Sequence, residues 1–343
     1  MKTNIVPSTK LVSMSSSKMQ SLSCDRFYFW QWVLDLVPKK LNMAFWFGTV
    51  MHAAFKAMVT TKKYKNICKI MDEASKIEIA KYALVAEDSV EIQLQLSIMK
   101  IIIKVYLEEY SSRITQLSET RTEEMFATKL TESPVIYEGT IDSYGYKRSK
   151  PVLIERKTTS TISDDFFKLL KFDIQINGYA QAIKSELLGE YPTHCIYEAF
   201  RKPKIKVRKD ESPKDFLIRL EEDLHARKDW YYVSHRHMFG KHSIMEAFTD
   251  IERATAQLYS KYKQLSTAQL LNPYYWPRRQ KQCLSYGVCP YFILCKNCQK
   301  YPLYLKLYQQ RELRYENEQK ELADKPLKME EPKLKLKPKH YKK

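Results

Sequence analysis

Residues 137–179 contain three short motifs in a fixed order: YEGTID at 137–142, VLIERK at 152–157 and QINGY at 175–179. In a β-strand, residues two apart point to the same face, so the second motif places Glu155 and Lys157 together. Asp142 is expected on the neighbouring strand. Gln175 and Tyr179 stand four residues apart, so they share one face of a predicted helix. The stretch therefore predicts two acid groups and an ammonium group gathered at one place on a sheet.

These residue types suit one kind of chemistry. Carboxylate oxygens are hard ligands that favour Mg²⁺ or Mn²⁺. A lysine beside such a cation stabilises negative charge at a phosphorus atom or orients an attacking water. Glu-x-Lys alone is common on solvated strands and predicts nothing. The ordered set of all three motifs is far harder to obtain by chance, and it favours a metal-dependent phosphodiester hydrolase.

The order of the surrounding segments predicts the fold. Helices are expected at 47–58, with Gly48 and Thr49 as the N-cap, at 66–110 and at 166–188. Strands are expected at 121–130, 135–143, 152–157 and 195–200, with a basic hairpin loop at 144–150 around Gly145 and a mostly helical, charged stretch at 213–265. This order predicts an α/β fold with a mixed central sheet flanked by helices.

Charge points to a polyanionic partner. The 343 residues include 58 Lys and Arg against 40 Asp and Glu, a net charge of +18. Nucleic acid is the first candidate partner and an anionic membrane surface the second, while a solubilising surface with a basic tail is the alternative. No apolar run reaches the ~18 residues of a membrane span, and residues 1–20 lack the apolar core of a secretory signal.

The motif set resembles the PD-(D/E)XK nuclease superfamily, and within it the RecB-like exonuclease branch of phage-type or CRISPR-associated-type stand-alone nucleases. Gly48-Thr49-Val50-Met51-His52 also matches the Gly-x-x-x-His pattern of that branch. The resemblance covers roughly residues 21–298. It implies a restriction-endonuclease-like core at 115–200 with helical elaborations.

The resemblance also assigns roles. His52, Asp142 and Glu155 would ligate the metal, with the Arg156 carbonyl as a further ligand. Lys157 would be catalytic, and Gln175 and Tyr179 would shape the site. An acidic residue on the first core strand is expected as well, where Glu124 is preferred to Glu123.

Five of the seven cysteines suggest a metal group. Cys283, Cys289, Cys295 and Cys298 crowd the C-terminal part, and Cys24 precedes Asp25-Arg26-Phe27-Tyr28. Thiolates this dense in a reducing compartment bind an iron–sulfur cluster or zinc. By resemblance to cluster-containing RecB-like nucleases, we expect Cys24, Cys283, Cys289 and Cys295 to hold a [4Fe-4S] cluster. Zinc and plain reduced cysteines are the alternatives.

Two basic segments are expected to neutralise DNA phosphates near the site. They are Lys147, Arg148 and Lys150 in the hairpin loop, and Arg201, Lys202 and Lys204 in the loop after the fourth strand. The aromatic run Tyr274-Tyr275-Trp276 is expected to pack in a C-terminal subdomain, with base stacking as the alternative.

The expected organisation is a flexible leader at 1–20, one nuclease domain at 21–310 with a Cys-rich segment at 272–298, and a charged tail at 311–343 that is disordered at its end. The leading interpretation is a Mg²⁺-dependent deoxyribonuclease, an exonuclease rather than an endonuclease, that acts on DNA ends or single strands in the cytoplasm, or in the host cytoplasm if phage-encoded. A recombination or replication protein is a further expected partner. The alternatives are a catalytically decayed nuclease fold that serves DNA recombination or repair as a DNA-binding accessory protein, and a structural metal-binding protein.

Overall fold

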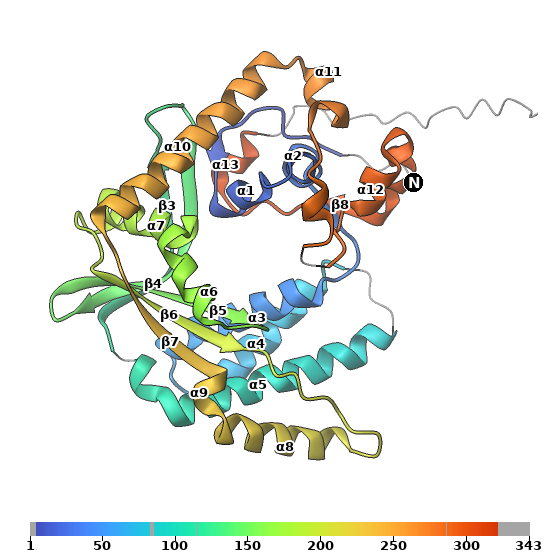
Figure 1. The fold of residues 1–343 in the computed structure, drawn as a ribbon. Helices are drawn as coiled ribbons and strands as arrows, with labels where there is room; N and C mark the ends of the chain where they lie inside the picture. The colour runs from blue at the N-terminus through green and yellow to red at the C-terminus, as the bar shows by residue number, and fades with distance from the viewer. Residues whose placement is uncertain (1–4, 83–85, 115, 286, 322–343) are drawn as a thin grey trace, which may run out of the picture. The chain divides into compact units, whose positions relative to one another are not determined.

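The computed structural model describes residues 5–82, 86–114, 116–285 and 287–321 (Figure 1). The chain forms two compact units. Unit 1 consists of Met1–Lys39 with Ala256–Lys343, and unit 2 of Lys40–Thr255. The boundary falls inside α10 (Lys241–Gln264). The expected nuclease domain at 21–310 spans residues of both units, and the two ends of the chain belong to one unit. The end of the expected tail, 322–343, lies outside the described residues.

Unit 2 contains the predicted mixed sheet, which confirms the α/β fold class. Five of its strands pair in the order β3-β4-β5-β6-β7; in this series β5 and β6 run parallel and the other neighbours antiparallel. The strands are β3 (Ser118–Lys129), β4 (Ile136–Lys147), β5 (Lys150–Thr159), β6 (His194–Arg201) and β7 (Tyr232–Met238). Strand β7 was not predicted, because its tyrosine and two histidines follow directly on the helical stretch α9 (Lys228–Tyr231).

The β4–β5 hairpin is tighter than expected. Lys147 pairs with Lys150, and Arg148 and Ser149 form the turn with φ of 51° and 58°. Both central residues lie in the left-handed region, as a two-residue hairpin turn requires. Gly145, which was expected in the loop, pairs with Val152 inside the ladder. A Cβ at position 145 would meet the Ser118 carbonyl oxygen at 2.7 Å, so the close approach of β3 explains this glycine.

One face of the sheet is covered by long helices. Phe55 of α3 and Tyr106 of α5 pack on Phe200 of β6, and they belong to a large apolar core. The helices of this core are α3 (Met43–Thr60), α4 (Tyr64–Ile79), α5 (Ala86–Ile114) and α8 (Pro213–Ala226). Helix α3 begins before the predicted cap, because Asn42 Oδ1 accepts hydrogen bonds from the Ala44 and Phe45 amides. The expected cap residues Gly48 and Thr49 lie inside the helix.

The other face carries shorter helical segments. The expected helix at 166–188 is divided into α6 (Asp164–Lys168), the 3-10 turn η2 (Leu169–Phe172), α7 (Ile174–Ala182) and the π-helical turn η3 (Ile183–Leu187). The division occurs at Asp173, whose side chain accepts from the Gln175 and Ile176 amides and caps α7. This cap places Gln175 in the first turn of α7.

Unit 1 is built around aromatic side chains. Trp276 is fully buried and stacks on Tyr28 at 5.7 Å, and Tyr291 stacks on Tyr308 at 5.8 Å. The expected packing role of the 274–276 run therefore holds for Trp276, whereas Tyr274 stays 59% exposed. The elements of unit 1 are β1 (Ser13–Met14), α1 (Ser16–Ser21), α2 (Asp25–Tyr28), η1 (Phe29–Val33), β2 (Leu36–Pro38), α11 (Thr267–Leu270), η4 (Pro273–Tyr275), η5 (Gln280–Cys283), α12 (Phe292–Lys296), η6 (Cys298–Leu307), β8 (Tyr308–Gln310) and α13 (Glu316–Gln319). Strands β2 and β8 pair antiparallel.

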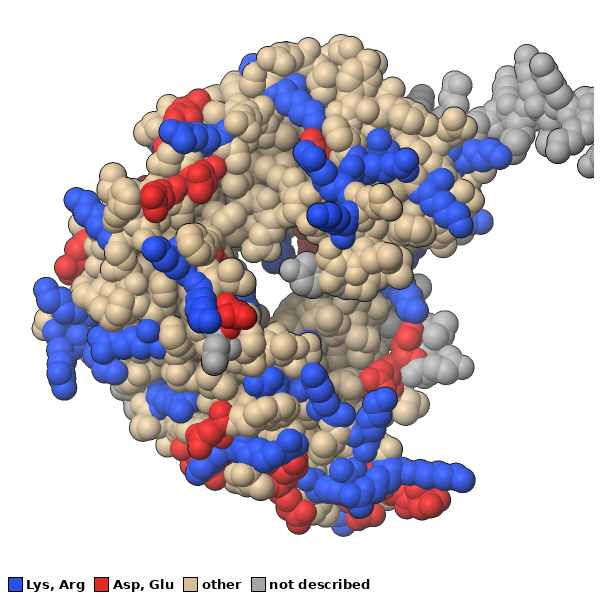
Figure 2. Space-filling model, in the orientation of Figure 1, with Lys and Arg blue, Asp and Glu red and all other residues tan. Residues whose placement is uncertain are grey.

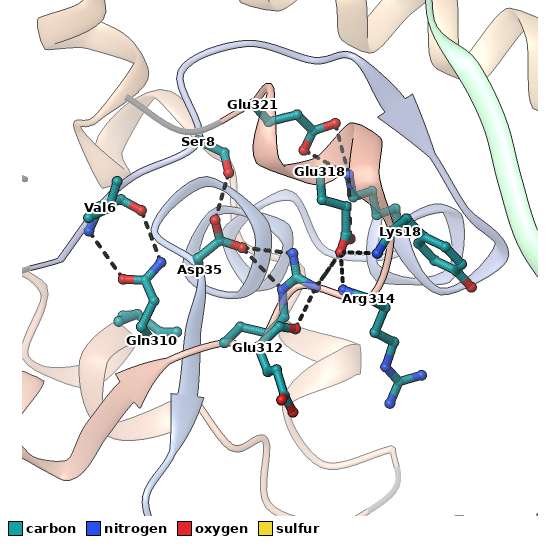
Figure 3. Close-up of polar contacts among 12 residues, drawn as sticks. Val6, Ser8, Lys18, Asp35, Gln310, Glu312, Arg314, Glu318 and Glu321 are labelled. Carbon is teal, nitrogen blue, oxygen red and sulfur yellow. Dashed lines mark hydrogen bonds and ion pairs between the residues drawn. The ribbon is translucent and has the colours of Figure 1, made fainter. Parts of the chain in front are cut away.

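A buried polar network joins the two ends of the chain (Figure 3). Lys18 Nζ lies 2.8 Å from Glu321 Oε2, and Arg311 contacts both Asp35, at 3.0 Å, and Glu318, at 3.2 Å. Residues 1–20 were expected to be a flexible leader, and for the described part, 5–20, this expectation is wrong. Lys18 is buried with Ile5, Leu11 and Met14.

Among the described residues, no helix combines the length and apolar character that crossing a bilayer demands.

Candidate active site and cysteine cluster

The predicted site lies where β4 and β5 separate. Their ladder runs from Lys147 and Lys150 to Ser143 and Ile154, and it ends there. Asp142 is the next residue on β4. Its Oδ2 accepts a hydrogen bond from the Arg156 amide at 3.1 Å, so the carboxylate bridges the gap between the two backbones. The separation leaves the Asp142 and Glu155 side chains at the end of a paired hairpin.

Three potential ligands meet at this point. His52 of α3 has its Nδ1 3.4 Å from Asp142 Oδ1. The ligand atoms of His52, Glu123 and Asp142 all lie within 4.8 Å of one another. Imidazole and carboxylate groups at this separation suit one divalent cation.

Glu123, and not the expected Glu124, joins this group. Thr122 pairs with Ser143 and Glu124 with Ile141, which places Glu123 directly across from Asp142. Glu124 instead lies 3.9 Å from Arg121. Glu123 also has a φ of 52°, in the left-handed region, and such backbone strain gathers at functional sites. The sequence gives no register between two strands, so it did not separate these adjacent glutamates.

Glu155, Lys157, Gln175 and Tyr179 form a connected set beside the group. Lys157 Nζ lies 2.9 Å from Glu155 Oε1 and donates to Gln175 Oε1 at 3.0 Å. Gln175 Nε2 lies 3.1 Å from Glu155 Oε1 and 2.9 Å from the Tyr179 hydroxyl. The four residues expected to act together are therefore in contact.

Burial sets the charge of this site. It raises the pKa of Asp142 to about 6, an effect that the Lys157 ammonium opposes. Burial and then the Asp142 carboxylate raise the pKa of Glu155 to about 7. Burial alone would lower the pKa of Lys157, but the Glu155 and Asp142 carboxylates raise it to about 12. The lysine is thus a fixed cation beside two acids that are costly to ionise without a further positive charge.

These residues fit a divalent cation. Glu155 Oε2 is buried and has no hydrogen-bond partner among the described residues, whereas Oε1 is held by Lys157 and Gln175. An unpartnered buried carboxylate oxygen is costly, and a cation would satisfy it. His52, Glu123, Asp142 and Glu155 are the side chains that would hold it.

Arg156 faces away from this group. Its guanidinium is buried and donates to Glu198 Oε2 at 2.8 Å, and Glu198 Oε1 accepts from the Tyr106 hydroxyl at 2.7 Å. The side chain therefore anchors β5 to the α5 side of the sheet. The Arg156 amide, and not its side chain, contacts Asp142, and the expected ligand role of the Arg156 carbonyl stays a prediction.

The two basic segments differ in their relation to the site. The turn with Lys147, Arg148 and Lys150 lies at the opposite end of the β4–β5 ladder, five residues or roughly 17 Å from Asp142. The expectation that it lies near the site opening is wrong. The segment after β6 lies at the Lys157 end of β5, because Thr159 pairs with Arg201.

Within that second segment, two cations are already engaged. The Arg201 guanidinium stacks on Trp230 at 4.1 Å, and Lys202 lies over Phe47 at 4.2 Å. Lys204 is exposed, and Lys and Arg side chains gather over this loop between β6 and α8 (Figure 2).

The expected cluster cysteines gather in unit 1. Burial, and after it the nearby Cys295, Cys283 and Cys24 thiols, raise the pKa of the Cys289 thiol to about 11. Donors point at the sulfurs: the Arg279 amide to Cys24 at 3.3 Å, and Trp30 Nε1 to Cys295 at 3.2 Å. The Arg26 guanidinium points to the fifth cysteine, Cys298, at 3.0 Å.

The spacing of the sulfurs bears on which metal group they suit. Among the described cysteines, no three sulfurs lie within 4.8 Å of one another. A single tetrahedral zinc, with Zn–S bonds of about 2.3 Å, needs its sulfurs closer than that. A cluster holds each thiolate on a different iron and accepts wider spacing. Cys68 and Cys195 lie in unit 2, in α4 and β6.

Comparison with known proteins identifies the class. The model of the PD-(D/E)XK nuclease superfamily matches residues 13–296, and the chain belongs to this superfamily. Among solved structures, it is similar to a crystal structure described as a "Putative exonuclease" from Eubacterium rectale, with 13% identity, a TM-score of 0.46, and coverage of 83% of this chain and 92% of that one.

A second solved structure, SSO0001, matches with 11% identity, a TM-score of 0.28, and coverage of 73% of this chain and 82% of that one. A search of curated proteins found no match. The family assignment rests on the family model.

Proposed function

We propose that this nuclease is a divalent-metal-dependent exonuclease of the RecB-like branch that hydrolyses phosphodiester bonds at DNA ends. The observation that carries the proposal is the meeting of His52, Glu123 and Asp142 next to the connected Glu155 and Lys157 at the opening between β4 and β5. A nuclease superfamily member with an intact ligand set and an adjacent ammonium has what phosphodiester hydrolysis requires.

The roles of the residues follow from their contacts. A bound Mg²⁺ or Mn²⁺ would supply Lewis acidity and an activated water. Lys157, held as a cation by Glu155, stabilises the negative charge that develops on the scissile phosphate oxygens. Gln175 fixes the positions of both Lys157 and Glu155 through its amide, and Tyr179 orients that amide. Lys204 is exposed at the same end of the sheet, where it would contact a flanking phosphate, while Arg201 and Lys202 beside it lie against Trp230 and Phe47.

We further propose that Cys24, Cys283, Cys289 and Cys295 hold a [4Fe-4S] cluster. The gathering of these cysteines in unit 1 and the N–H donors aimed at the Cys24 and Cys295 sulfurs support this assignment. Iron analysis and an absorption band near 400 nm in anaerobically purified protein test this assignment. Colourless protein without iron would exclude it. The cytoplasmic location and a recombination or replication partner remain predictions from the sequence.

Digestion of end-labelled linear DNA and of closed circular DNA, with Mg²⁺, Mn²⁺ or EDTA, tests the main proposal. We expect metal-dependent loss of linear DNA and survival of circles. Lys157→Ala and Asp142→Ala should each abolish cleavage while DNA binding, measured by fluorescence anisotropy, survives. Undiminished cleavage by both variants would refute the site assignment. Binding without cleavage by the wild-type protein would instead favour a decayed nuclease fold.

A further inference from the structure

We propose that α6, η2 and the edge strand β7 form a subsite for a single DNA strand on the same sheet face as Glu155. In this subsite, Lys168 and Lys171 with His235 and His237 hold a backbone phosphate, and Phe172 stacks on a base. The inference rests on the proposed nuclease function and extends it to how the strand is held.

The first observation is a cavity of about 410 Å³ between these elements. Its lining consists of Phe167, Lys168, Lys171, His235 and His237, and no carboxylate lines it. The His235 ring stacks on Phe167 at 4.5 Å with an interplanar angle of 19°, which gives the cavity a rigid aromatic wall. Ammonium and imidazole groups without acidic neighbours in the lining select an anion.

Two acidic groups of the described residues act on the lining. The Asp173 carboxylate partly offsets the lowering of the His237 pKa that burial causes. Asp165 pairs with Lys168 at 2.8 Å, but both side chains are largely exposed, with 82% and 74% of their surface in water. An exposed pair of this kind contributes little and exchanges readily for a phosphate. Lys171 is exposed and lies over the Phe172 ring at 5.8 Å. Figure 2 shows basic side chains, with acidic ones beside them, over the region of α6.

Strand register connects the cavity to the active site. Glu155 pairs with Tyr197 on β6, and Tyr197 pairs with His235 on β7. Residues paired in this way share a face, so Glu155 and His235 point to the same side, where α6 and α7 lie (Figure 1). The distance across the sheet from β5 to β7 is two strand spacings, or roughly 10 Å. A single DNA strand covers this distance in about three nucleotides when its bases stack at 3.4 Å, and in fewer when it is extended.

A further observation is an apolar surface on η2. Leu169 is 63% exposed and Phe172 is 71% exposed, although the chain has a large core that could bury them. Phe172 stands three residues before Gln175, directly before the Asp173 cap of α7. Exposed aromatics next to cations are how proteins bind single strands without reading sequence. The charge around this surface and its continuity with the catalytic face favour a DNA strand as its occupant.

The test measures binding of a fluorescein-labelled 12-nucleotide single strand by anisotropy, with Mg²⁺, in full-length protein that carries Lys157→Ala to stop cleavage. We expect the Phe172→Ala variant to bind about 5- to 150-fold more weakly, as removal of one stacked base predicts. The Lys168→Ala/Lys171→Ala variant should also bind more weakly. Its slope of log K against log salt should be shallower, by about 0.7 for each phosphate that the protein no longer neutralises.

The matched control is Lys65→Ala/Lys69→Ala on α4, which removes the same charge from two other exposed lysines of unit 2. An equal effect of the control and pocket pairs would overturn the subsite. A second experiment changes the DNA and leaves the protein as it is: each phosphate of the strand is replaced in turn by a neutral methylphosphonate. Replacement of the phosphate held in the subsite should weaken binding to the Lys157→Ala protein. The same replacement should have no effect on binding to the protein that also carries Lys168→Ala/Lys171→Ala.

The two proposals can fail separately. Linear DNA that survives in the wild-type protein with either metal would contradict the nuclease proposal, whatever the anisotropy shows. The subsite alone would be contradicted if the wild-type protein cleaves DNA but neither Phe172→Ala nor Lys168→Ala/Lys171→Ala weakens binding.

Discussion

Two adjacent glutamates on β3 give the sharpest test of the candidate metal site. Glu123 lies opposite Asp142 and within 4.8 Å of His52 and Asp142, whereas Glu124 is directed to Arg121. We expect Glu123→Gln to slow cleavage by on the order of 100-fold, because loss of a ligand oxygen weakens metal-based charge stabilisation by about 3 kcal/mol. Glu124→Gln should change the rate less than about threefold, within the usual reach of a surface substitution.

Cleavage rates at saturating DNA, measured over a range of Mn²⁺ concentrations, check this prediction. The Glu123→Gln rate should recover partly at high Mn²⁺, since the remaining ligands still bind the cation. Equal loss in both variants, or a larger loss in Glu124→Gln, would contradict the arrangement of ligands described above.

The raised pKa values of the acid groups predict a pH dependence. Asp142 has a pKa of about 6 and Glu155 of about 7, and only the ionised forms can ligate a cation. As pH rises through about 6 to 7, both groups lose their protons, so metal affinity and cleavage should rise. A higher metal concentration should shift the midpoint to lower pH, because the cation and the protons compete for the same oxygens. Rates measured between pH 5.5 and 8.5 at two Mg²⁺ concentrations test this, and a midpoint independent of metal would contradict it.

At the scale of elements, the sequence was informative where local patterns determine structure. Alternation along β5 predicted that Glu155 and Lys157 share a face, and the i, i+4 spacing predicted that Gln175 and Tyr179 act together; both pairs are in contact. Long-range geometry was not accessible in this way. The register of β3 on β4, which selects Glu123, depends on pairing that no local pattern encodes.

The hairpin turn and strand β7 show the same limit. Gly145 suggested a loop, but it is required by the approach of Ser118 on the next strand. A close approach of helix and strand likewise explains Gly178 of α7, where a Cβ would lie 2.3 Å from the Tyr137 hydroxyl oxygen. This contact lets α7 sit close enough to β4 and β5 for Gln175 to reach Glu155. Tertiary packing, rather than turn chemistry, accounts for both glycines.

At the scale of the whole molecule, unit 1 is closed by residues from both ends of the chain. Ser13, Lys18 and Glu321 form hydrogen bonds across more than 300 residues of sequence, and Arg311 contacts Asp35. Residues 1–20 suggested a leader because the segment is polar. Its apolar residues Ile5, Leu11 and Met14, which are buried, are also not spaced as in a helix or a strand. Their partners stand at the other end of the chain, where sequence reading does not connect them.

The buried Lys18–Glu321 pair makes a prediction about the stability of unit 1. Lys18 Nζ donates to both Glu321 carboxylate oxygens at 3.0 and 2.8 Å, and both side chains are buried. Glu321→Ala leaves the ammonium without its main partner, so we expect a loss of about 3 kcal/mol in the free energy of unfolding. This value is at the low end for a broken buried ion pair, because the Glu318 carboxylate stays 4.0 Å from the Lys18 ammonium. Lys18→Met/Glu321→Leu removes both charges and should recover most of that loss.

Urea denaturation followed by tryptophan fluorescence measures this effect, since Trp30, Trp32 and Trp276 all lie in unit 1. Glu246→Ala, which breaks an exposed pair with His242 on α10, is the control and should cost less than about 0.5 kcal/mol. A Glu321→Ala protein as stable as this control would contradict the closing role of the pair. A double variant less stable than Glu321→Ala would show that packing, and not the unpaired charge, governs this end of the chain.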